Sequence, residues 1–378
     1  METAGPYVER LDVEGAAAHA GAWRDLCGRA LDANAFAEPG FLIAAARHIA
    51  PPGLELVFAW ESAERLRLLG VLALAPPLLG VAAVWRSKEA GLAAMVLDRD
   101  GAAAAFEAAA LWLSKARPRA AGLLVPALAA DGATAKLLEA VAGRLGLAFI
   151  AHNRRQRAIL YPARDGQGRF EAALPGKRLK DWRRLRRRFA ERGGLVFRSA
   201  RGAEAAQAAE AFLALEPKNW KGRGGAPLAA DPGRAAFARA ALAAFAAEDK
   251  LRVDWLEFVG APAAMGLLLL SKDRAFYWKT AYDEAFAEFS PGVLLTLDIS
   301  RKQQDDPRIA ATDSCAIAGH PMIERLWLQR LELVDCLVAL RPGAAWRLNL
   351  WLAGRRLASR AKDAAKRLIF PMLGRKHS

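Results

Sequence analysis

Apolar residues dominate three short runs between Leu251 and Asp283. The runs are LRVDWLEFV, AAMGLLLLS and AFYWKTAYD, and Gly-Ala-Pro and Lys-Asp-Arg separate them. Each run is rich in β-branched, aromatic or long apolar residues, so we expect three strands joined by turns. After Ser290-Pro291-Gly292 the sequence VLLTLDISRKQQ has a helical period. Ser is a typical N-cap residue and Pro a typical first helical residue, so this triplet predicts a helix start.

A helix that begins at Ser290 would present an anion-binding site at its first turn. The first N–H groups of a helix lack helical partners and lie at the positive end of the helix dipole, an arrangement that binds phosphate. Gly292, Val293 and Leu294 would supply these donors, whereas Pro291 has no N–H. We therefore expect a phosphate site with one donor fewer than usual.

The order of predicted elements is similar in the two halves of the chain: helix, strand, helix, meander, helix. This likeness of order predicts two units of related fold, at residues 1–165 and 170–343, joined by a linker at 166–169 and followed by a tail at 344–378. Short apolar runs are expected to close the units as strands: Leu147–Ile150 and Arg157–Tyr161 in the first, Leu333–Leu340 in the second.

The longest uncharged run, Leu68–Trp85, has the length of a membrane span. Pro76-Pro77 divides it in the middle, and Gly70 and Gly80 interrupt it further. Proline breaks a helix, so we expect two buried strands around a turn.

Cysteine is sparse among the 378 residues, which are 54% apolar. The three cysteines argue against a disulfide framework and indicate a reducing compartment. They and the five histidines show no metal-ligand spacing. The first residues are charged and lack the apolar core of a signal peptide, so we expect a cytoplasmic protein.

Positive charge is concentrated in the second half. The net charge is +15, with 18 Lys/Arg against 16 Asp/Glu up to residue 164 and 37 against 24 afterwards. Gly176–Gly193 carries nine basic and two acidic residues around an apolar helical face. It is either a surface helix with solvated charges or a binding element for an anionic ligand. The basic run has two aromatic residues, Trp182 and Phe189, too few for a base-stacking platform, so nucleic acid is disfavoured as a partner.

A second basic helix is predicted at Ala344–Leu373. Residues 341–378 contain ten Lys/Arg and one acidic residue. Apolar positions at helical spacing share one face: Trp346, Leu350, Ala353, Leu357, Ala361, Ala364 and Leu368. Such a helix either lies on an anionic membrane surface or packs on the domain. Peripheral contact with the inner membrane through residues 344–373 is therefore one of two alternatives.

A charged, glycine-rich loop follows Leu215. It contains Glu216, Trp220, Lys221 and Arg223 beside three glycines, which allow the backbone to approach a ligand closely. No Gly-Lys-Ser/Thr is present, so the loop is not a P-loop.

Three short motifs carry a resemblance to a known family: Trp220-Lys221-Gly222, Ala281-Tyr282-Asp283 and Ser290-Pro291-Gly292. Together they resemble the GNAT acyltransferases of the CelD/BcsL type, an acetyltransferase-like group associated with bacterial cellulose biosynthesis operons and similar to the FemABX aminoacyl transferases. The resemblance extends from about Leu174 to Leu340, and by layout over the first half. It implies an α/β (α+β) fold of tandem GNAT-like domains, each a mixed, mostly antiparallel sheet flanked by helices. The Gln/Arg-x-x-Gly-x-Gly/Ala loop of ordinary GNAT enzymes is absent.

The resemblance implies N- or O-acetyl transfer from acetyl-CoA or another acyl-CoA to an amine or hydroxyl, with no metal. The acceptor would be a small molecule, a glycan or an envelope-related molecule. The donor pyrophosphate would lie at Ser290, Gly292, Val293 and Leu294. Backbone donors near Tyr277 and Trp278 would polarise the carbonyl. The catalytic candidates are Glu216, Asp283 and Asp313 as bases and Tyr282 as general acid. The candidates for acceptor binding are Trp220, Lys221, Arg223 and Lys279.

Each catalytic candidate also has a structural interpretation. Glu216 can cap or pair locally, Asp283 can be a turn residue, Asp313 an N-cap, and Tyr282 can fill the meander. Cys315 and His320 lie five residues apart, which is more typical of structural residues than of a nucleophile and its base. Two other functions stay open for the whole chain. They are a non-catalytic GNAT-fold protein that binds an anionic surface or ligand, and a FemABX-like, tRNA-dependent aminoacyl transferase.

Overall fold

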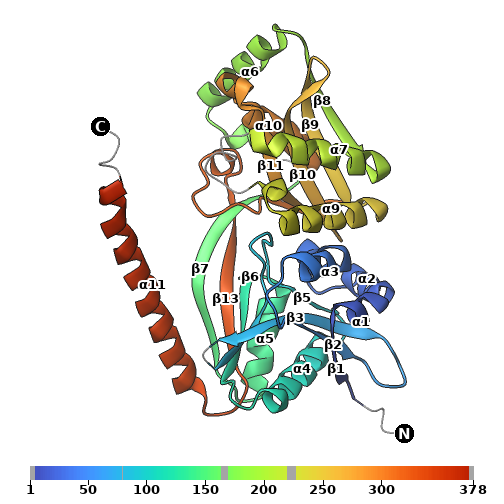
Figure 1. Cartoon of the computed structure of the whole chain (residues 1–378), viewed down its shortest axis with the longest axis vertical. Helices are drawn as coiled ribbons and strands as arrows, with labels where there is room; N and C mark the ends of the chain where they lie inside the picture. The colour runs from blue at the N-terminus through green and yellow to red at the C-terminus, as the bar shows by residue number, and fades with distance from the viewer. Residues whose placement is uncertain (1–4, 79, 163–168, 219–226, 374–378) are drawn as a thin grey trace.

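One continuous sheet of 13 strands runs through both halves of the chain (Figure 1). The computed structural model describes residues 5–78, 80–162, 169–218 and 227–373. The first half contributes β1 (Tyr7–Leu11), β2 (Glu55–Trp60), β3 (Leu68–Leu78), β4 (Val81–Val84), β5 (Met95–Leu97), β6 (Gly122–Ala129) and β7 (Phe149–Leu160). The second half contributes β8 (Leu195–Arg201), β9 (Leu251–Phe258), β10 (Ala261–Ser271), β11 (Arg274–Tyr282), β12 (Ala311–Asp313) and β13 (Gln329–Ala339).

The strand order shows the same unit twice. In the first half, the antiparallel strands β1 to β4 are followed by β6, which pairs with β4 in parallel. In the second half, β8 to β11 are followed by β12, which is parallel to β11. The predicted tandem arrangement of mixed, mostly antiparallel sheets is therefore confirmed.

The strands that close the two units are exchanged. β13 pairs with β6 of the first half, and β7 pairs with β12 of the second. β7 and β13 also pair with each other along most of their length. The prediction that each unit is closed by its own strands is therefore wrong. The two runs expected at Leu147–Ile150 and Arg157–Tyr161 are one strand, because β7 continues through the charged residues between them.

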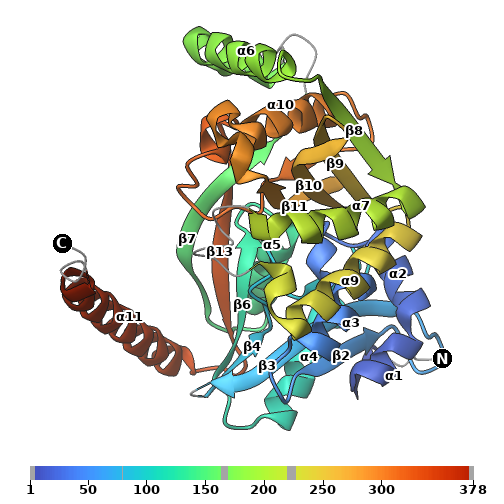
Figure 2. The ribbon, with the colours of Figure 1, turned by 45° about the horizontal axis from the view of Figure 1, so that its top comes forward.

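Helices cover both faces of the sheet (Figures 1 and 2). The first half supplies α1 (Val13–Ala18), α2 (Ala20–Gly28), α3 (Pro39–His48), α4 (Ala102–Ala116) and α5 (Ala133–Arg144). The second half supplies α6 (Gly176–Ala190), α7 (Gly202–Leu215), α9 (Pro232–Ala247), α10 (Pro291–Gln304) and α11 (Ala345–Leu373). Short 3-10 turns are η1 (Ala35–Ala37), η2 (Phe170–Ala173), η3 (Glu216–Lys218), η4 (Leu228–Ala230), η5 (Glu284–Phe289) and η6 (Ile323–Arg325).

A shared core joins the halves where α3 packs on α9. Phe41 of α3 contacts Phe237 of α9 with ring centroids 5.1 Å apart, and it also meets Trp278 of β11. Phe36 of η1 contacts Phe276 of β11 at 5.3 Å. Aromatic side chains of the first half thus cover one face of β11. They hold the first half against the strand that contains the predicted site residues.

Several further expectations can be compared with the structure. The run Leu68–Trp85 forms β3 and β4, as two strands around a turn. Among the described residues, no helix is long and apolar enough to cross a membrane. The helix start at Ser290 is also present, but Ser290 adopts a left-handed conformation with φ 51° and its side chain makes no capping hydrogen bond. Ser290 is therefore the N-cap residue, as predicted, but its side chain does not contribute to capping.

Candidate functional site

The candidate site is built around the open edge of β11. The strand pairs with β10 along its length, but with β12 on its other side only from Arg274 to Phe276. The register with β10 jumps between Tyr277 and Lys279, so Trp278 is the extra residue of a β-bulge. A bulge bends its strand and increases the local twist. From Tyr277 to Tyr282, β11 therefore diverges from β12 and leaves a backbone edge that no described strand pairs.

α10 lies against this part of the sheet and begins next to Tyr282. The Tyr282 ring is the nearest neighbour of Gly292, with Cδ1 3.5 Å from the position that a Cβ on this glycine would occupy. Tyr277 points to the same side, where its hydroxyl lies 3.2 Å from Oγ1 of Thr296 in α10. The first turn of α10 is thus held beside the open edge.

The first turn of α10 offers fewer free donors than expected. The N–H groups of Val293 and Leu294 both donate to the Ser290 carbonyl, at 2.9 and 3.2 Å. Pro291 has no N–H. Of the three predicted donors, Gly292 is the one whose N–H has no hydrogen bond to a described residue. An anion here would meet one backbone N–H and the positive end of the helix dipole.

A buried polar network fixes α10 on the sheet. Arg252 of β9 donates to the Asp254 carboxylate at 2.8 Å and to Oε1 of Gln303 at 2.6 Å. Gln303, near the end of α10, donates in turn to Oγ1 of Thr312 in β12 at 2.8 Å. Because this network joins β9, α10 and β12, it holds the helix in one position relative to the strands on both sides of the divergence.

A loop of the first half reaches the other face of β11. Glu89 accepts a hydrogen bond from Nζ of Lys279 at 2.6 Å and from Nε of Arg234 at 3.0 Å. The Glu89 carbonyl accepts from Nε1 of Trp278 at 2.7 Å. Burial alone would raise the pKa of Glu89, but the charges and hydrogen bonds of Lys279 and Arg234 outweigh it and lower the pKa. Glu89 is therefore an ionised bridge between the halves.

A cavity of about 290 Å³ opens beside this bridge. Its lining comes from β7, β11 and the loops that follow β4 and β12, and it includes Arg86, Lys88, Glu89, Arg155, Arg157, Trp278, Lys279 and Cys315. Burial, and then the charges of Arg155 and Arg157, lower the pKa of Arg86. Cations thus outnumber carboxylates in the lining, which favours an anionic group in this cavity.

Arg157 and Asp313 form a buried ion pair at the back of the cavity. Arg157 also donates to the Gly91 carbonyl at 3.0 Å, while its Nε has no partner among the described residues. Asp313 accepts a second hydrogen bond, from the Cys315 N–H at 2.9 Å. Asp313 is therefore the counter-ion of Arg157 in β12. It does not cap a helix, which was the structural alternative considered for it.

The other predicted catalytic residues lie near the end of β11. Tyr282 is half-buried, which raises the pKa of its phenol. Asp283 caps η5 by accepting from the Ala285 N–H at 3.0 Å, and its second oxygen lies 3.8 Å from Nζ of Lys218. Glu216 accepts from the Leu228 N–H at 2.6 Å. The structure thus brings Tyr282, Asp283 and the start of α10 together.

The remaining predicted acceptor residues divide into two groups. Lys279 lies in the cavity lining, where it pairs with Glu89. Trp220, Lys221 and Arg223 lie outside the described residues. Sequence reasoning missed Arg86, Glu89 and Arg157. A signal for two of them was the charged group Arg86-Ser87-Lys88-Glu89, which follows directly after a long uncharged run.

Cys315 lies in the cavity but is not an activated thiol. Burial raises its pKa well above the usual value, and the neighbouring Asp313 carboxylate adds to the shift. The thiolate is the reactive form of cysteine, so this environment argues against a nucleophile. Nδ1 of His320 accepts from the Met322 N–H at 3.3 Å, a local turn contact. Both residues fit the structural interpretation.

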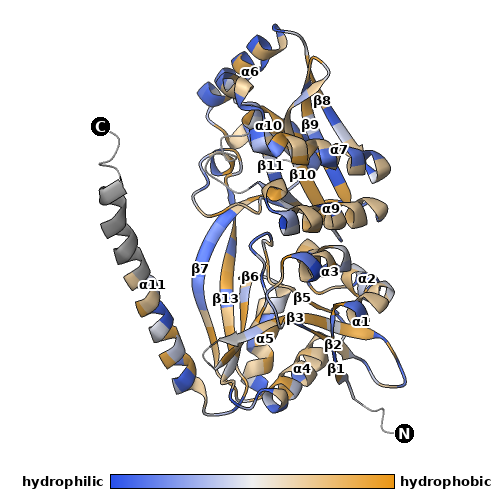
Figure 3. Ribbon diagram, viewed as in Figure 1, coloured by the Kyte–Doolittle hydropathy of each residue, from blue (hydrophilic) through white to orange (hydrophobic). Residues whose placement is uncertain are grey.

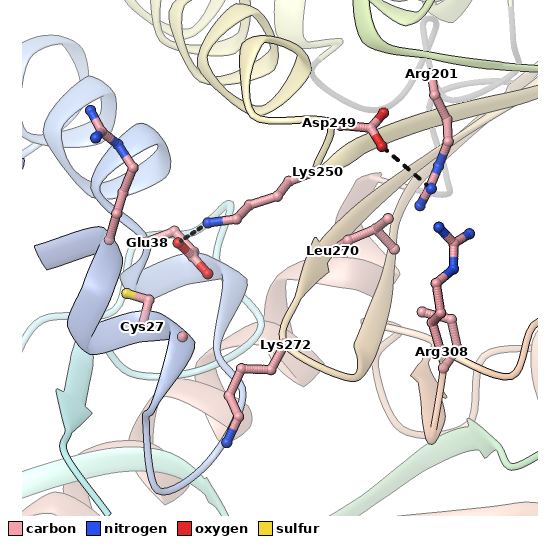
Figure 4. Close-up of a pocket in the computed structure, with 11 residues that line it drawn as sticks. Cys27, Glu38, Arg201, Asp249, Lys250, Leu270, Lys272 and Arg308 are labelled. Carbon is pink, nitrogen blue, oxygen red and sulfur yellow. Dashed lines mark hydrogen bonds and ion pairs between the residues drawn. The ribbon is translucent and has the colours of Figure 1, made fainter. Parts of the chain in front are cut away.

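A second cavity, of about 340 Å³, lies between α2 and the ends of β9 and β10 (Figure 4). It contains several cations, but they have partners in the protein. Lys250 contacts Glu38 at 2.9 Å, and Arg201 faces Asp249 at 3.5 Å. Lys272 donates to the Ala30 carbonyl at 2.6 Å. We interpret this cavity as part of the contact between the two halves, where charged residues pair with one another.

Comparisons with known proteins agree with this geometry. The model of a GNAT acetyltransferase domain family matches residues 176–311. No curated protein matches the chain.

Solved structures share the fold at low sequence identity. One is the C-terminal DUF2156 domain of a putative lysylphosphatidylglycerol synthetase from Agrobacterium fabrum, at TM-score 0.54 and 11% identity, covering 89% of this chain and 96% of the other. FemX has TM-score 0.55 and 10% identity, with 90% and 99% covered. A conserved protein of unknown function from Bacteroides thetaiotaomicron has TM-score 0.55 and 12% identity, with 85% and 97% covered. The chain therefore has this fold over nearly its whole length. The family match spans α6 to the start of β12, and so includes both the open edge and α10.

Proposed function

We propose that the protein is an acyltransferase that moves an acyl group from a thioester, most simply acyl-CoA, to an amine or hydroxyl. The observation that carries the proposal is the open edge of β11 after the bulge at Trp278, with the start of α10 beside it. Unpaired backbone N–H groups at such an edge can bind the oxygen of a reacting carbonyl. The match of residues 176–311 to a GNAT acetyltransferase domain supports the same reaction.

The proposed reaction balances with two side chains at the end of β11. The acceptor amine or hydroxyl attacks the carbonyl carbon, the carbon–sulfur bond breaks, and the thiol leaves. Asp283 would take the proton from the acceptor, and the Tyr282 hydroxyl would donate one to the departing sulfur. The raised pKa of Tyr282 keeps the phenol protonated, as this role requires. Asp313 is a weaker candidate for the base because Arg157 already holds it.

We further propose that the acceptor carries an anionic group and enters from the cavity beside Glu89. Arg86 and Lys88 would contact that group, and Lys279 would border it. An acidic glycan or another envelope-related molecule fits this chemistry. The motifs around Trp220, Tyr282 and Pro291 favour the CelD/BcsL group within the GNAT enzymes.

Thiol release tests the proposal. Purified protein is incubated with acetyl-CoA and a panel of amines and sugars, and free thiol is followed. Tyr282→Phe and Asp283→Asn should abolish release but retain CoA binding, whereas Tyr161→Phe, outside the site, should behave as wild type. Absence of both turnover and CoA binding would refute the acyl-CoA reaction. It would leave the non-catalytic binding protein or an ester donor.

An aminoacyl ester is the second candidate donor. Two observations favour it: the first turn of α10 has one free N–H of the three predicted for a pyrophosphate, and α6 is strongly basic. FemX and the putative lysylphosphatidylglycerol synthetase have the same fold. This candidate predicts transfer from charged tRNA, with binding that weakens steeply as salt rises. Transfer from charged tRNA without use of acetyl-CoA would establish it in place of acyl-CoA.

A further inference from the structure

The last helix, α11, is attached to the protein by its first turns. Leu348, Trp351 and Leu352 are buried against the sheet, in a cluster with residues of β4, β6 and β13. Arg347 donates to the Arg119 carbonyl at 2.9 Å. After Leu352 the described residues of α11 are exposed up to Ala361, and the helix extends away from the body (Figures 1 and 2).

The face that docks is not the apolar stripe that the sequence predicts. At about 100° per residue, Trp346, Leu350 and Leu357 lie on one side of the helix, away from Leu348 and Leu352. Their exposed fractions are 66%, 65% and 65%. Trp346 and Leu350 also border a groove of about 700 Å³ whose other wall includes Val81 and Ala121. A stripe of large apolar side chains therefore faces solvent next to an apolar groove.

The charges around this stripe are positive. Arg356 and Arg360 are exposed, one helical turn apart, and follow the stripe on one side. Arg355 lies over the Trp351 ring at 4.9 Å, so its charge stays close to the body. Residues 341–378 carry ten Lys/Arg and one acidic residue. The described part of α11 thus alternates between apolar and hydrophilic positions (Figure 3).

Charge decides which partner fits this surface. A second copy of α11 would bring the same arginines together, because one acidic residue cannot neutralise them. An anionic bilayer supplies both complements, namely phosphate groups for the arginines and an apolar interior for the stripe. Tryptophan is enriched at membrane–water interfaces, which suits Trp346 at the base of the helix.

We infer that α11 is an interfacial membrane helix. Trp346, Leu350 and Leu357 insert below the headgroups of an anionic bilayer, and Arg356 and Arg360 bind lipid phosphates. The helix lies in the plane of the surface and does not cross the bilayer. This inference is independent of the proposed acyl transfer, since it rests on residues outside the candidate site.

Vesicle flotation of the full chain tests the inference. Wild type should float with phosphatidylcholine vesicles that contain phosphatidylglycerol and not with phosphatidylcholine alone, and added salt should weaken binding. Trp346→Ser/Leu350→Ser/Leu357→Ser should reduce affinity at least about 100-fold, given the apolar area withdrawn from lipid. Arg356→Gln/Arg360→Gln should reduce it about tenfold or more, because each surface-bound arginine contributes separately.

Two matched controls distinguish membrane binding by α11 from non-specific binding of the protein to vesicles. Leu111→Ser removes an exposed leucine of α4, and Arg178→Gln/Arg183→Gln removes two exposed charges of α6. Both should bind vesicles as wild type does, and all variants should keep the wild-type circular dichroism. The inference is overturned if wild type does not float, or if the α11 variants bind like wild type. It is also overturned if the α6 variant loses binding equally. A concentration-dependent dimer without lipid that the triple substitution abolishes would assign the stripe to self-association instead.

Discussion

Glu89→Gln should destabilise the protein, although Glu89 is in a loop. Its side chain is 7% exposed and bridges Lys279 and Arg234, which are 25% and 22% exposed. Glutamine keeps the shape but removes the charge, so Lys279 and Arg234 both lose their ion pair with this carboxylate. Removing one partner of a buried pair typically costs about 3–5 kcal/mol, and partial exposure of the cations lowers this to about 2–3 kcal/mol.

Urea unfolding measures this cost. The matched control is Glu210→Gln, which breaks the exposed pair between Glu210 and Arg239. It should leave the free energy of unfolding unchanged within about 1 kcal/mol. Lys279→Gln should be less destabilising in the Glu89→Gln background than in wild type, because the pair is already broken. Equal midpoints for wild type and Glu89→Gln, or additive effects of the two substitutions, would refute the bridge.

The same bridge has a defined pH dependence. The pKa of Glu89 is lower in the folded protein than its ordinary value of 4.5. A group with a depressed folded pKa contributes its full stability above the unfolded pKa and loses it as pH falls through the folded pKa. The stability difference between wild type and Glu89→Gln should therefore be constant at neutral pH and shrink below about pH 4.5. A difference that grows on acidification would contradict the assignment.

Three further outcomes follow from the described contacts. Asp313→Asn should lower stability by about 3–5 kcal/mol, because it leaves Arg157 buried without a counter-ion; a variant of wild-type stability that has lost thiol release would instead identify Asp313 as the base. Gly266→Ala should cost about 1–3 kcal/mol, since its Cβ would lie 2.8 Å from the Tyr277 ring, whereas Gly143→Ala, with open space around it, should not destabilise. Cys27, Cys315 and Cys336 should resist a thiol reagent at pH 8 until the protein is unfolded, because burial raises the pKa of each thiol; rapid labelling of the native protein would contradict this.

Local patterns of sequence predicted the elements and the tandem fold. The three runs from Leu251 to Asp283 are β9, β10 and β11, and Ser290-Pro291-Gly292 begins α10, because turn residues and apolar periods are local signals. Exchange of the closing strands was not predictable in this way. β7 and β13 are 170 or more residues apart where they pair, and nothing local distinguishes pairing with one half from pairing with the other.

The candidate site was predicted in part for the same reason. Tyr282, Asp283 and the start of α10 are close in sequence, and the structure places them together. Glu89 and Arg157 reach β11 and β12 from the first half, so their roles depend on contacts between distant segments. Backbone geometry also limited the prediction. Ser290 adopts a left-handed conformation, and its carbonyl accepts hydrogen bonds from the N–H groups of Val293 and Leu294, which the sequence pattern had suggested as free donors.

Strand exchange explains why residues of both halves surround the candidate site. β11 diverges from β12, and on the far side of β12 lies β7, a strand of the first half that carries Arg157. β7 is fixed in turn by β13, so the position of Arg157 depends on the last strand of the chain. The Glu89 loop approaches from the other side and binds Lys279 and Trp278. A fragment limited to residues 176–311 would contain the open edge and α10 but lack Arg86, Glu89 and Arg157. The matched segment contains the open edge where we propose that the acyl group binds, whereas the proposed acceptor cavity is lined by residues of both halves.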